Sequence, residues 1–210
     1  MRQTKIICTI GPACNNKETI LKMIDAGMNV ARFNMSHGDY GELEKTFATV
    51  KEAIAESGKN VALLLDTKGP EVRIGHIEGG KTEIVEGQDF TLFRDEVVGN
   101  NEGVSISYPK LIKKLMKYNK AKGLKLLLDD GKISMQIKKV LDDRIVCKVL
   151  VGGELGSRKS INIPDYNIDM PYVSKKDRED IDFGIKMGIN VIAASFVRNG
   201  DDVRTLRDYV

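Results

Sequence analysis

Cysteine, histidine and long apolar runs are all scarce in this chain of 210 residues, and each scarcity excludes a class of protein. Three cysteines and two histidines, scattered along the sequence, match no zinc-ligand spacing. No apolar run approaches the ~20 residues that cross a bilayer. The short apolar stretch at the N-terminus is broken by Thr9 and Pro12, which argues against a signal peptide. We therefore expect a cytoplasmic protein with reduced thiols and no membrane partner.

The chain also has no large excess of positive charge, because it contains 33 basic and 30 acidic side chains. This balance leaves no general signature of a nucleic-acid partner. Residues 110–125 hold seven lysines and no acidic residue. A nucleic acid or an anionic membrane could bind such a run, but a solvated helix face is the more common reason for it. Residues 151–160 lack the Gly-Lys-Ser/Thr ending of a phosphate loop, so we interpret them as a hairpin with Lys159 on the surface.

The two ends of the sequence alternate between apolar strands and amphipathic helices. This alternation is typical of parallel βα units with right-handed crossovers. Ser174 and Asp177 provide an N-terminal cap and a favourable charge for one of the helices. The pattern predicts strands at 5–11, 28–36, 61–67 and 189–197, and helices at 17–27, 39–58, after Ser174 and from residue 200 onward.

The middle of the sequence, about 72 to 168, has short alternating segments between glycine-rich turns, which predicts an antiparallel β module. Its turns at 129–132 and 141–144 predict hairpins, and only 108–118 has a helical pattern. We expect a βα domain interrupted by an inserted β domain, with proline residues at the junctions. The predicted boundaries are 1–70 for the first part of the βα domain, 71–169 for the insert and 170–210 for the continuation.

Polar side chains gather at the predicted carboxyl ends of the strands, where parallel α/β proteins bind ligands. Arg32, Asn34 and Ser36 share one face of the second strand, and Asp66 and Thr67 end the third. A structural Arg32–Asp66 ion pair would explain part of this cluster. The oxygen donors also suit a cation, and a single carboxylate among neutral oxygens favours a monovalent one.

The guanidinium groups of Arg32 and Arg73 suit the recognition of phosphate or carboxylate, so we expect an anionic, phosphorylated substrate. Four βα units do not close a parallel barrel, which needs eight. The four strands therefore form either an open sheet or the front part of a longer protein.

Six segments, in this order, resemble the pyruvate kinase family over essentially the whole chain: KIICTIGPA, NVARFNMSHG, LLLDTKGPEVR, LLLDDG, GSRKSINIP and IAASFVR. The resemblance implies an α/β fold that comprises the first four βα units of a TIM (β/α)8 barrel, with an all-β, β-barrel lid domain inserted after the third strand. It also implies the glycolytic transfer of a phosphoryl group from phosphoenolpyruvate to ADP, which gives pyruvate and ATP.

The resemblance assigns roles to individual residues. Arg32 is similar to the family's substrate-binding arginine, and Arg32 and Arg73 are implied to be catalytic. The nucleotide is implied to contact Asn34, His37, Arg73 and Lys159. The implied potassium ligands are Asn34, Ser36, Asp66 and Thr67. Closure of the lid would expel water and bring Arg73 and Lys159 onto the phosphates.

The resemblance leads to further expectations about the cofactors, the oligomeric state and the activity. The resemblance implies Mg²⁺ as a second cofactor and a homotetrameric parent enzyme. The family's catalytic lysine and its Mg²⁺ carboxylates have no counterpart in these 210 residues, so we expect the chain to be inactive by itself. Three alternatives stay open: a different enzyme on a phosphoenolpyruvate-using barrel, a stand-alone anion- or nucleotide-binding module built on the lid, and a fragment of a longer protein.

Overall fold

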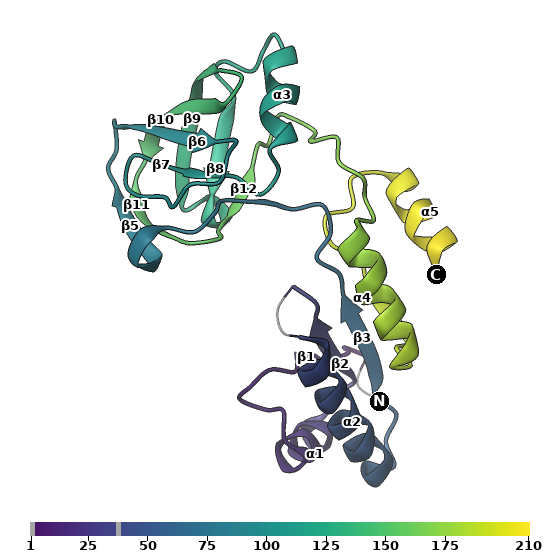
Figure 1. Cartoon of the computed structure of the whole chain (residues 1–210). Coiled ribbons are helices and arrows are strands. Elements are labelled where there is room, and N and C mark those ends of the chain that lie inside the picture. The colour runs from purple at the N-terminus through teal and green to yellow at the C-terminus, as the bar shows by residue number, and fades with distance from the viewer. Residues whose placement is uncertain (1–2, 37–38) are drawn as a thin grey trace. The chain divides into compact units, whose positions relative to one another are not determined.

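The computed structural model describes residues 3–36 and 39–210. The chain divides into two compact units, each with its own hydrophobic core (Figure 1). The parallel-sheet unit comprises Met1–Pro70 and Pro171–Val210. The β-rich unit comprises Glu71–Met170. No helix in the described part of the chain is both long enough and apolar enough to cross a membrane.

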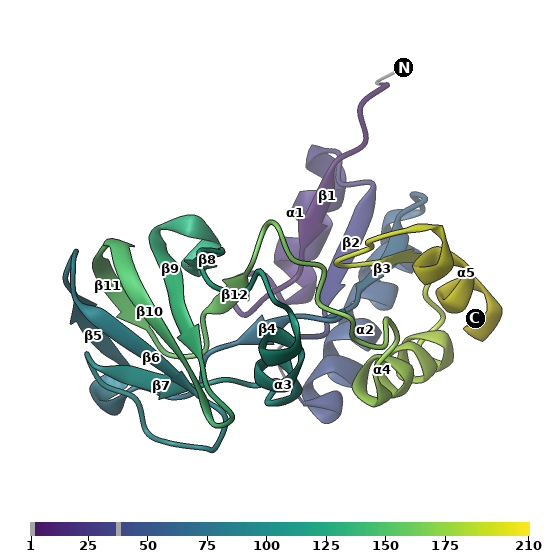
Figure 2. The same ribbon diagram turned by 90° about the horizontal axis from the view of Figure 1, so that it is seen from above.

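The parallel-sheet unit contains a four-stranded sheet in the order β1-β2-β3-β13, in which every neighbouring pair is parallel. Figure 2 shows β1, β2 and β3 running side by side. The predicted alternation of strands and helices is confirmed. The strands are β1 (Ile7–Thr9), β2 (Val30–Asn34), β3 (Ala62–Asp66) and β13 (Val191–Ala193), and the helices are α1 (Lys17–Ala26), α2 (Tyr40–Ser57), α4 (Lys175–Lys186) and α5 (Gly200–Tyr209).

Capping side chains fix where these helices begin. The side chain of Asn16 accepts a hydrogen bond from the Thr19 N–H at the start of α1, and the side chain of Asp39 caps the start of α2 in the same way. Helix α4 begins with a reciprocal capping box between Ser174 and Asp177, as the sequence predicts. Burial of one helix face then supplies most of the stabilisation. Phe47 on α2 stacks on Phe33 of β2 with ring centroids 3.6 Å apart, at the centre of this core.

The β-rich unit contains a seven-stranded sheet in the order β4-β12-β8-β9-β10-β6-β7 and a two-stranded sheet of β11 and β5. A helix, α3 (Lys110–Lys117), packs its apolar side against this core and lies next to β9. The strands are β4 (Val72–Arg73), β5 (Lys81–Ile84), β6 (Asp89–Phe93), β7 (Gly103–Ser105), β8 (Lys125–Leu128), β9 (Ile133–Val140), β10 (Arg144–Val151), β11 (Gly153–Gly156) and β12 (Ser160–Asn162), and the short 3-10 helices are η1 (Glu78–Gly80) and η2 (Asp129–Gly131).

Backbone hydrogen bonds also join the two outer strands of the seven-stranded order. The Gly75 N–H donates to the Ser105 carbonyl at 2.8 Å, and the Ser107 N–H donates to the Arg73 carbonyl at 2.8 Å. The sheet thus closes on itself, so its outer strands are not left as open edges. The predicted hairpins at 129–132 and 141–144 are confirmed by the antiparallel β8–β9 and β9–β10 pairs.

Three details of the sequence-based prediction were wrong. The last strand of the parallel sheet covers only Val191–Ala193 instead of 189–197, because the backbone turns at Phe196, where φ is +58°. The β-rich unit is not wholly antiparallel, since β6 and β7 pair in parallel. Residues 151–160 do not form a hairpin, because β11 and β12 belong to different sheets.

Candidate functional site

The carboxyl ends of the parallel strands bring the predicted polar side chains together. Asn34 at the end of β2 is the register partner of Asp66 at the end of β3, and Asp66 is also the partner of Ala193 on β13. Within β2, Ala31 and Phe33 are buried in the core, whereas Arg32 and Asn34 are partly exposed on the opposite face. The predicted alternation of faces is therefore confirmed, and it places the polar groups at one end of the sheet.

Arg32 and Asp66 form an ion pair at this end. The Arg32 Nε donates to Oδ2 of Asp66 at 3.0 Å, and Nη2 makes a short contact with the same oxygen. Nη1 of Arg32 donates to the Thr9 hydroxyl at 2.7 Å. The Asp66 side chain is only 14% exposed and that of Arg32 is 36% exposed, so the guanidinium stays accessible while the carboxylate orients it.

The second oxygen of the Asp66 carboxylate has a different partner. Its Oδ1 accepts a hydrogen bond of 2.9 Å from the hydroxyl of Ser195, which follows β13. The Ser195 N–H in turn donates to the hydroxyl of the buried Thr67 at 3.2 Å. The ends of all four strands therefore share one network of polar contacts around Asp66, since Thr9 ends β1, Arg32 lies on β2 and Ser195 follows β13.

The remaining predicted cation ligands lie next to this network. Oδ1 of Asn34 accepts a hydrogen bond of 2.9 Å from the Ser36 N–H, which fixes the orientation of the amide. The backbone N–H of Met35 donates to the Asp66 carbonyl at 3.1 Å, so the chain after β2 stays close to β3. His37, the neighbouring predicted nucleotide contact, lies outside the described residues.

A pocket of about 800 Å³ opens beside Asn34 at the same end of the sheet. The loop after β1 forms one wall with Gly11 and Pro12, and α2 forms another. The α2 side chains were not among the predicted site residues, although the polar ones are spaced three and four residues apart, the signal that places them on one helix face. The polar ones are Glu42, Lys45, Thr46 and Thr49, and Leu43 of α2 also lines the pocket.

Arg73 and Lys159, the other predicted phosphate contacts, both lie in the β-rich unit. They are close to each other, because the Ile74 N–H donates to the Lys159 carbonyl at 2.9 Å and Arg73 is the register partner of Ser160. The Arg73 Nε donates to Glu71 at 2.6 Å, and its Nη1 donates to the Arg158 carbonyl at 2.9 Å.

The Lys159 ammonium is paired with Oδ1 of Asp129 at 2.9 Å, and Lys132 holds Oδ2 of the same carboxylate at 3.0 Å. These two hydrogen-bonded lysines, Lys159 foremost, hold the pKa of Asp129 below the ordinary value of an aspartate. A phosphate that binds Lys159 must therefore compete with Asp129.

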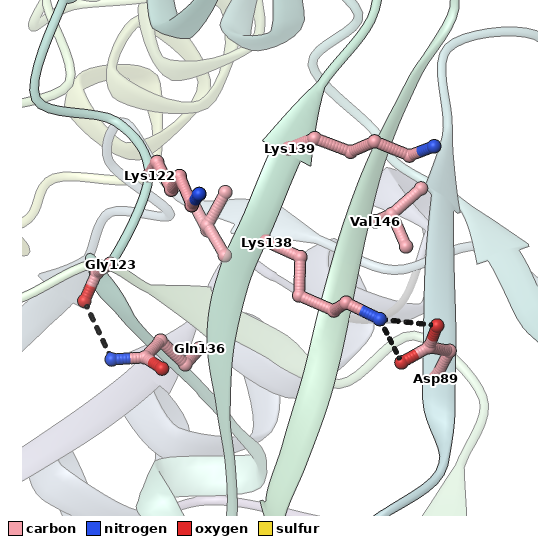
Figure 3. A pocket seen from close by; sticks show the side chains of 8 residues that line it. Asp89, Lys122, Gly123, Gln136, Lys138, Lys139 and Val146 are labelled. Atoms are coloured by element: carbon pink, nitrogen blue, oxygen red, sulfur yellow. Dashed lines mark hydrogen bonds and ion pairs between the residues drawn. The ribbon is translucent and has the colours of Figure 1, made fainter.

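A second pocket, of about 430 Å³, lies on the β-rich unit and has three lysines in its wall (Figure 3). The ammonium groups of Lys122 and Lys139 point in different directions, and Lys138 is already held by both oxygens of Asp89 at 2.9 and 2.8 Å. The lysines do not converge on one point, so this pocket is a weaker candidate for anion binding than the strand ends.

Carboxylates do not cluster in a way that suits a divalent metal. Across the ranges 3–36 and 39–210, no group of three or more His, Cys, Asp or Glu side chains could hold a metal ion. Asp66 contributes one carboxylate, and the Arg32 cation already lies against it. The donor set thus fits a monovalent cation and does not fit Mg²⁺.

Comparisons with known proteins give a consistent result. A family profile described as "Pyruvate kinase, barrel domain" matches residues 1–210. The chain is 44% identical over 209 residues to a pyruvate kinase of Geobacillus stearothermophilus and 40% identical over 210 residues to that of Bacillus licheniformis. A crystal structure of a pyruvate kinase from Cryptosporidium parvum superposes with a TM-score of 0.85 at 43% identity, covering 100% of this chain and 42% of that one.

The matched region is a part of each relative. The chain is covered to 99% in the comparisons with the curated relatives, but it spans only 35% of their length.

Proposed function

The chain belongs to the pyruvate kinase family, and we propose that its strand ends form one part of a site that transfers the phosphoryl group of phosphoenolpyruvate to ADP. The products are pyruvate and ATP. The observation that carries the proposal is the Arg32–Asp66 pair, which lies with Asn34 at the carboxyl ends of adjacent parallel strands.

Arg32 is the proposed substrate contact. Its guanidinium is held from one side by Asp66 and Thr9, which leaves a planar cationic group accessible to a phosphate or carboxylate oxygen. Phosphoryl transfer depends mainly on positioning and on neutralising charge, and little covalent chemistry falls to the protein. An oriented arginine performs both tasks, so we assign it a catalytic role.

Asn34, Ser36, Asp66 and Thr67 are the proposed ligands of K⁺. The structure supports this set because Asn34 and Asp66 are register partners and all four residues offer oxygen donors. When bound, K⁺ supplies additional positive charge beside the phosphoryl group. The described residues do not fit Mg²⁺, and we assign no Mg²⁺ ligand in this chain.

We propose that the pocket beside Asn34 accepts the nucleoside part of ADP or ATP. Its volume of about 800 Å³ suits a ligand of that size. In the β-rich unit, Arg73 and Lys159 are the proposed phosphate contacts, which requires each to exchange its present carboxylate partner for phosphate. The β-rich unit is then the inserted lid domain, 71–169, and the parallel sheet, 1–70 with 170–210, is the first half of a (β/α)8 barrel.

The experiment is a pair of measurements on the 210-residue protein. We expect titrations with phosphoenolpyruvate and with ADP, in K⁺, to show saturable binding. We expect a coupled assay of pyruvate formation with Mg²⁺ and K⁺ to show no turnover, because the described residues provide no Mg²⁺ site. Absence of binding to both ligands would contradict the proposed site. Turnover at the rates of a complete enzyme would contradict the conclusion that the described residues provide no Mg²⁺ site.

A second candidate function is that of an anion-binding module built on the β-rich unit, and one surface of this unit supports it. A groove of about 700 Å³ is lined by Arg94, by Asp142, and by four lysines and Met116 of α3. Only one of those lysines, Lys114, has a carboxylate partner among the described residues, Asp169 at 2.7 Å. Salt-sensitive binding of oligonucleotides or anionic lipid, without binding of ADP, would favour this alternative.

A further inference from the structure

We propose that Ser195 is a positioning residue for the monovalent-cation site, an inference that rests on the proposed function. Ser195 does not belong to the oxygen-donor set assigned above, but it contacts that set twice. Its hydroxyl donates to Oδ1 of Asp66 at 2.9 Å, and its backbone N–H donates to the Thr67 hydroxyl at 3.2 Å. Two of the four proposed ligands are therefore held by this single residue.

The Asp66 carboxylate shows why a second contact is needed. Both hydrogen bonds from Arg32 end on the same oxygen, Oδ2. A carboxylate held by one oxygen can still turn about its terminal torsion, which is broad for aspartate. The Ser195 hydroxyl holds the other oxygen and so fixes the carboxylate plane before a cation arrives. Fixing a ligand in advance lowers the entropic cost of binding.

Ser195 is itself held by its surroundings in the parallel-sheet unit. Its carbonyl accepts a hydrogen bond of 3.1 Å from the Tyr172 hydroxyl. The next residue, Phe196, has a φ of +58°, a conformation that a bulky side chain seldom adopts. Such a conformation persists where the surrounding structure enforces it, and it is enriched at functional sites. The turn that presents Ser195 to Asp66 is thus fixed by the protein and does not depend on a ligand.

Two other roles for Ser195 predict different behaviour. If Ser195 were merely part of the packing, any side chain of suitable size would preserve cation binding. If it were a direct ligand, loss of its oxygen would resemble loss of Asn34 or Ser36 and would abolish binding. A positioning role predicts an intermediate effect that follows the hydroxyl donor and not the side-chain volume.

The test compares Ser195→Thr with Ser195→Val, since threonine and valine have nearly the same shape and differ in the hydroxyl. The probe is Tl⁺, a spectroscopic substitute for K⁺, titrated by thallium NMR in tetramethylammonium nitrate and displaced with potassium nitrate. Ser195→Ala is a third variant, and circular dichroism checks that every variant is folded. The matched control is Ser160→Val, which removes a serine hydroxyl that donates to Oδ1 of Asp130 at 3.3 Å in the β-rich unit and leaves the hydroxyl contact of Ser195 with Asp66 in place.

We expect Ser195→Val to bind Tl⁺ about five- to tenfold more weakly than Ser195→Thr, the effect of losing one hydrogen bond to a charged group. Ser160→Val should bind Tl⁺ like the unaltered protein. Equal affinities of the threonine and valine variants would overturn the positioning role alone. If the unaltered protein bound no Tl⁺ that K⁺ displaces, the proposed cation site itself would be wrong, and this inference would fall with it.

Discussion

The backbone N–H of Gly69 donates a hydrogen bond of 3.0 Å to Oδ1 of Asp177. The other oxygen of this buried carboxylate accepts from the backbone N–H and the hydroxyl of Ser174 at the start of α4. One side chain therefore both caps a helix and holds the backbone just before Pro70, where the parallel-sheet unit ends its first segment. Only the first of these two roles is predicted from the sequence.

Substitution of Gly69 by alanine should destabilise the parallel-sheet unit. Gly69 has a φ of +67°, and an added Cβ would lie 2.5 Å from the Ser195 carbonyl oxygen. Gly58→Ala is the matched control, because Gly58 has a φ of +62° and a Cβ added there would meet nothing within 4 Å. We expect Gly69→Ala to lower the free energy of unfolding by at least about 1 kcal/mol more than Gly58→Ala does. Urea denaturation measures the difference, and equal losses would show that the close approach is relieved at no cost.

Replacement of Arg32 by lysine should weaken phosphoenolpyruvate binding about tenfold or more, because lysine keeps the charge but loses the planar fork. The hydrogen bonds to Thr9 and Asp66 that orient the guanidinium would be lost with it. Arg204→Lys is the control, since Arg204 is an exposed arginine paired with Asp201 and should not affect binding. A phosphorus NMR titration measures the affinity. An Arg32→Lys protein with unaltered affinity would remove Arg32 from the proposed site.

The Asp129 carboxylate should contribute to stability above its unfolded pKa and should lose that contribution in acid. Its pKa in the folded protein is lowered by the hydrogen bonds from Lys159 and Lys132, so the folded state favours the charged form. We expect the stability difference between the unaltered protein and Asp129→Asn to be constant near neutral pH and to shrink as pH falls below about 4. Urea denaturation over a pH series tests this, and a difference that grows in acid would reverse the assigned sign.

The thiol of Cys147 should resist modification in the folded protein. Burial in the core of the β-rich unit raises the pKa of Cys147 to about 12, so little thiolate forms near neutral pH. Cys8 and Cys14 are only partly buried. We expect Ellman's reagent to label Cys8 and Cys14 first and to reach Cys147 only after urea is added. Mass spectrometry of peptides identifies the labelled positions, and prompt labelling of Cys147 without urea would contradict its burial.

The sequence predicted the elements of this fold better than their ends. Periodicity and caps located α1, α2 and α4, because Gly27, Gly58 and Ser174 are local signals that do not depend on distant contacts. The end of β13 was missed because Phe196 adopts a positive φ, and nothing in the identity of a phenylalanine predicts that. The parallel β6–β7 pair was missed because pairing direction depends on where the connecting chain travels.

In the candidate site, too, the features set by the local sequence pattern were predicted and those set by distant contacts were missed. Alternation along β2 placed Arg32 and Asn34 on one face, and the register of parallel strands brought them to Asp66. The contacts of Ser195 and Thr9 with this group could not be predicted, because they depend on side-chain directions at the last residue of β1 and in the turn after β13. The pairing of Lys159 with Asp129 was missed for a related reason, since Asp129 lies in a turn with a φ of +48°.

The parallel sheet has a property that the closed sheet of the β-rich unit does not share. Within the described residues, β1 pairs only with β2 and β13 only with β3, so each outer strand presents backbone groups that face away from the sheet. Side chains on these strands, such as Ile7 and Val191, are 54% and 42% exposed. Such edges accept further strands by the same register that joins the first four, and each added strand would cover apolar surface. The parallel sheet is thus a template with two open edges, to each of which a further parallel strand can be added.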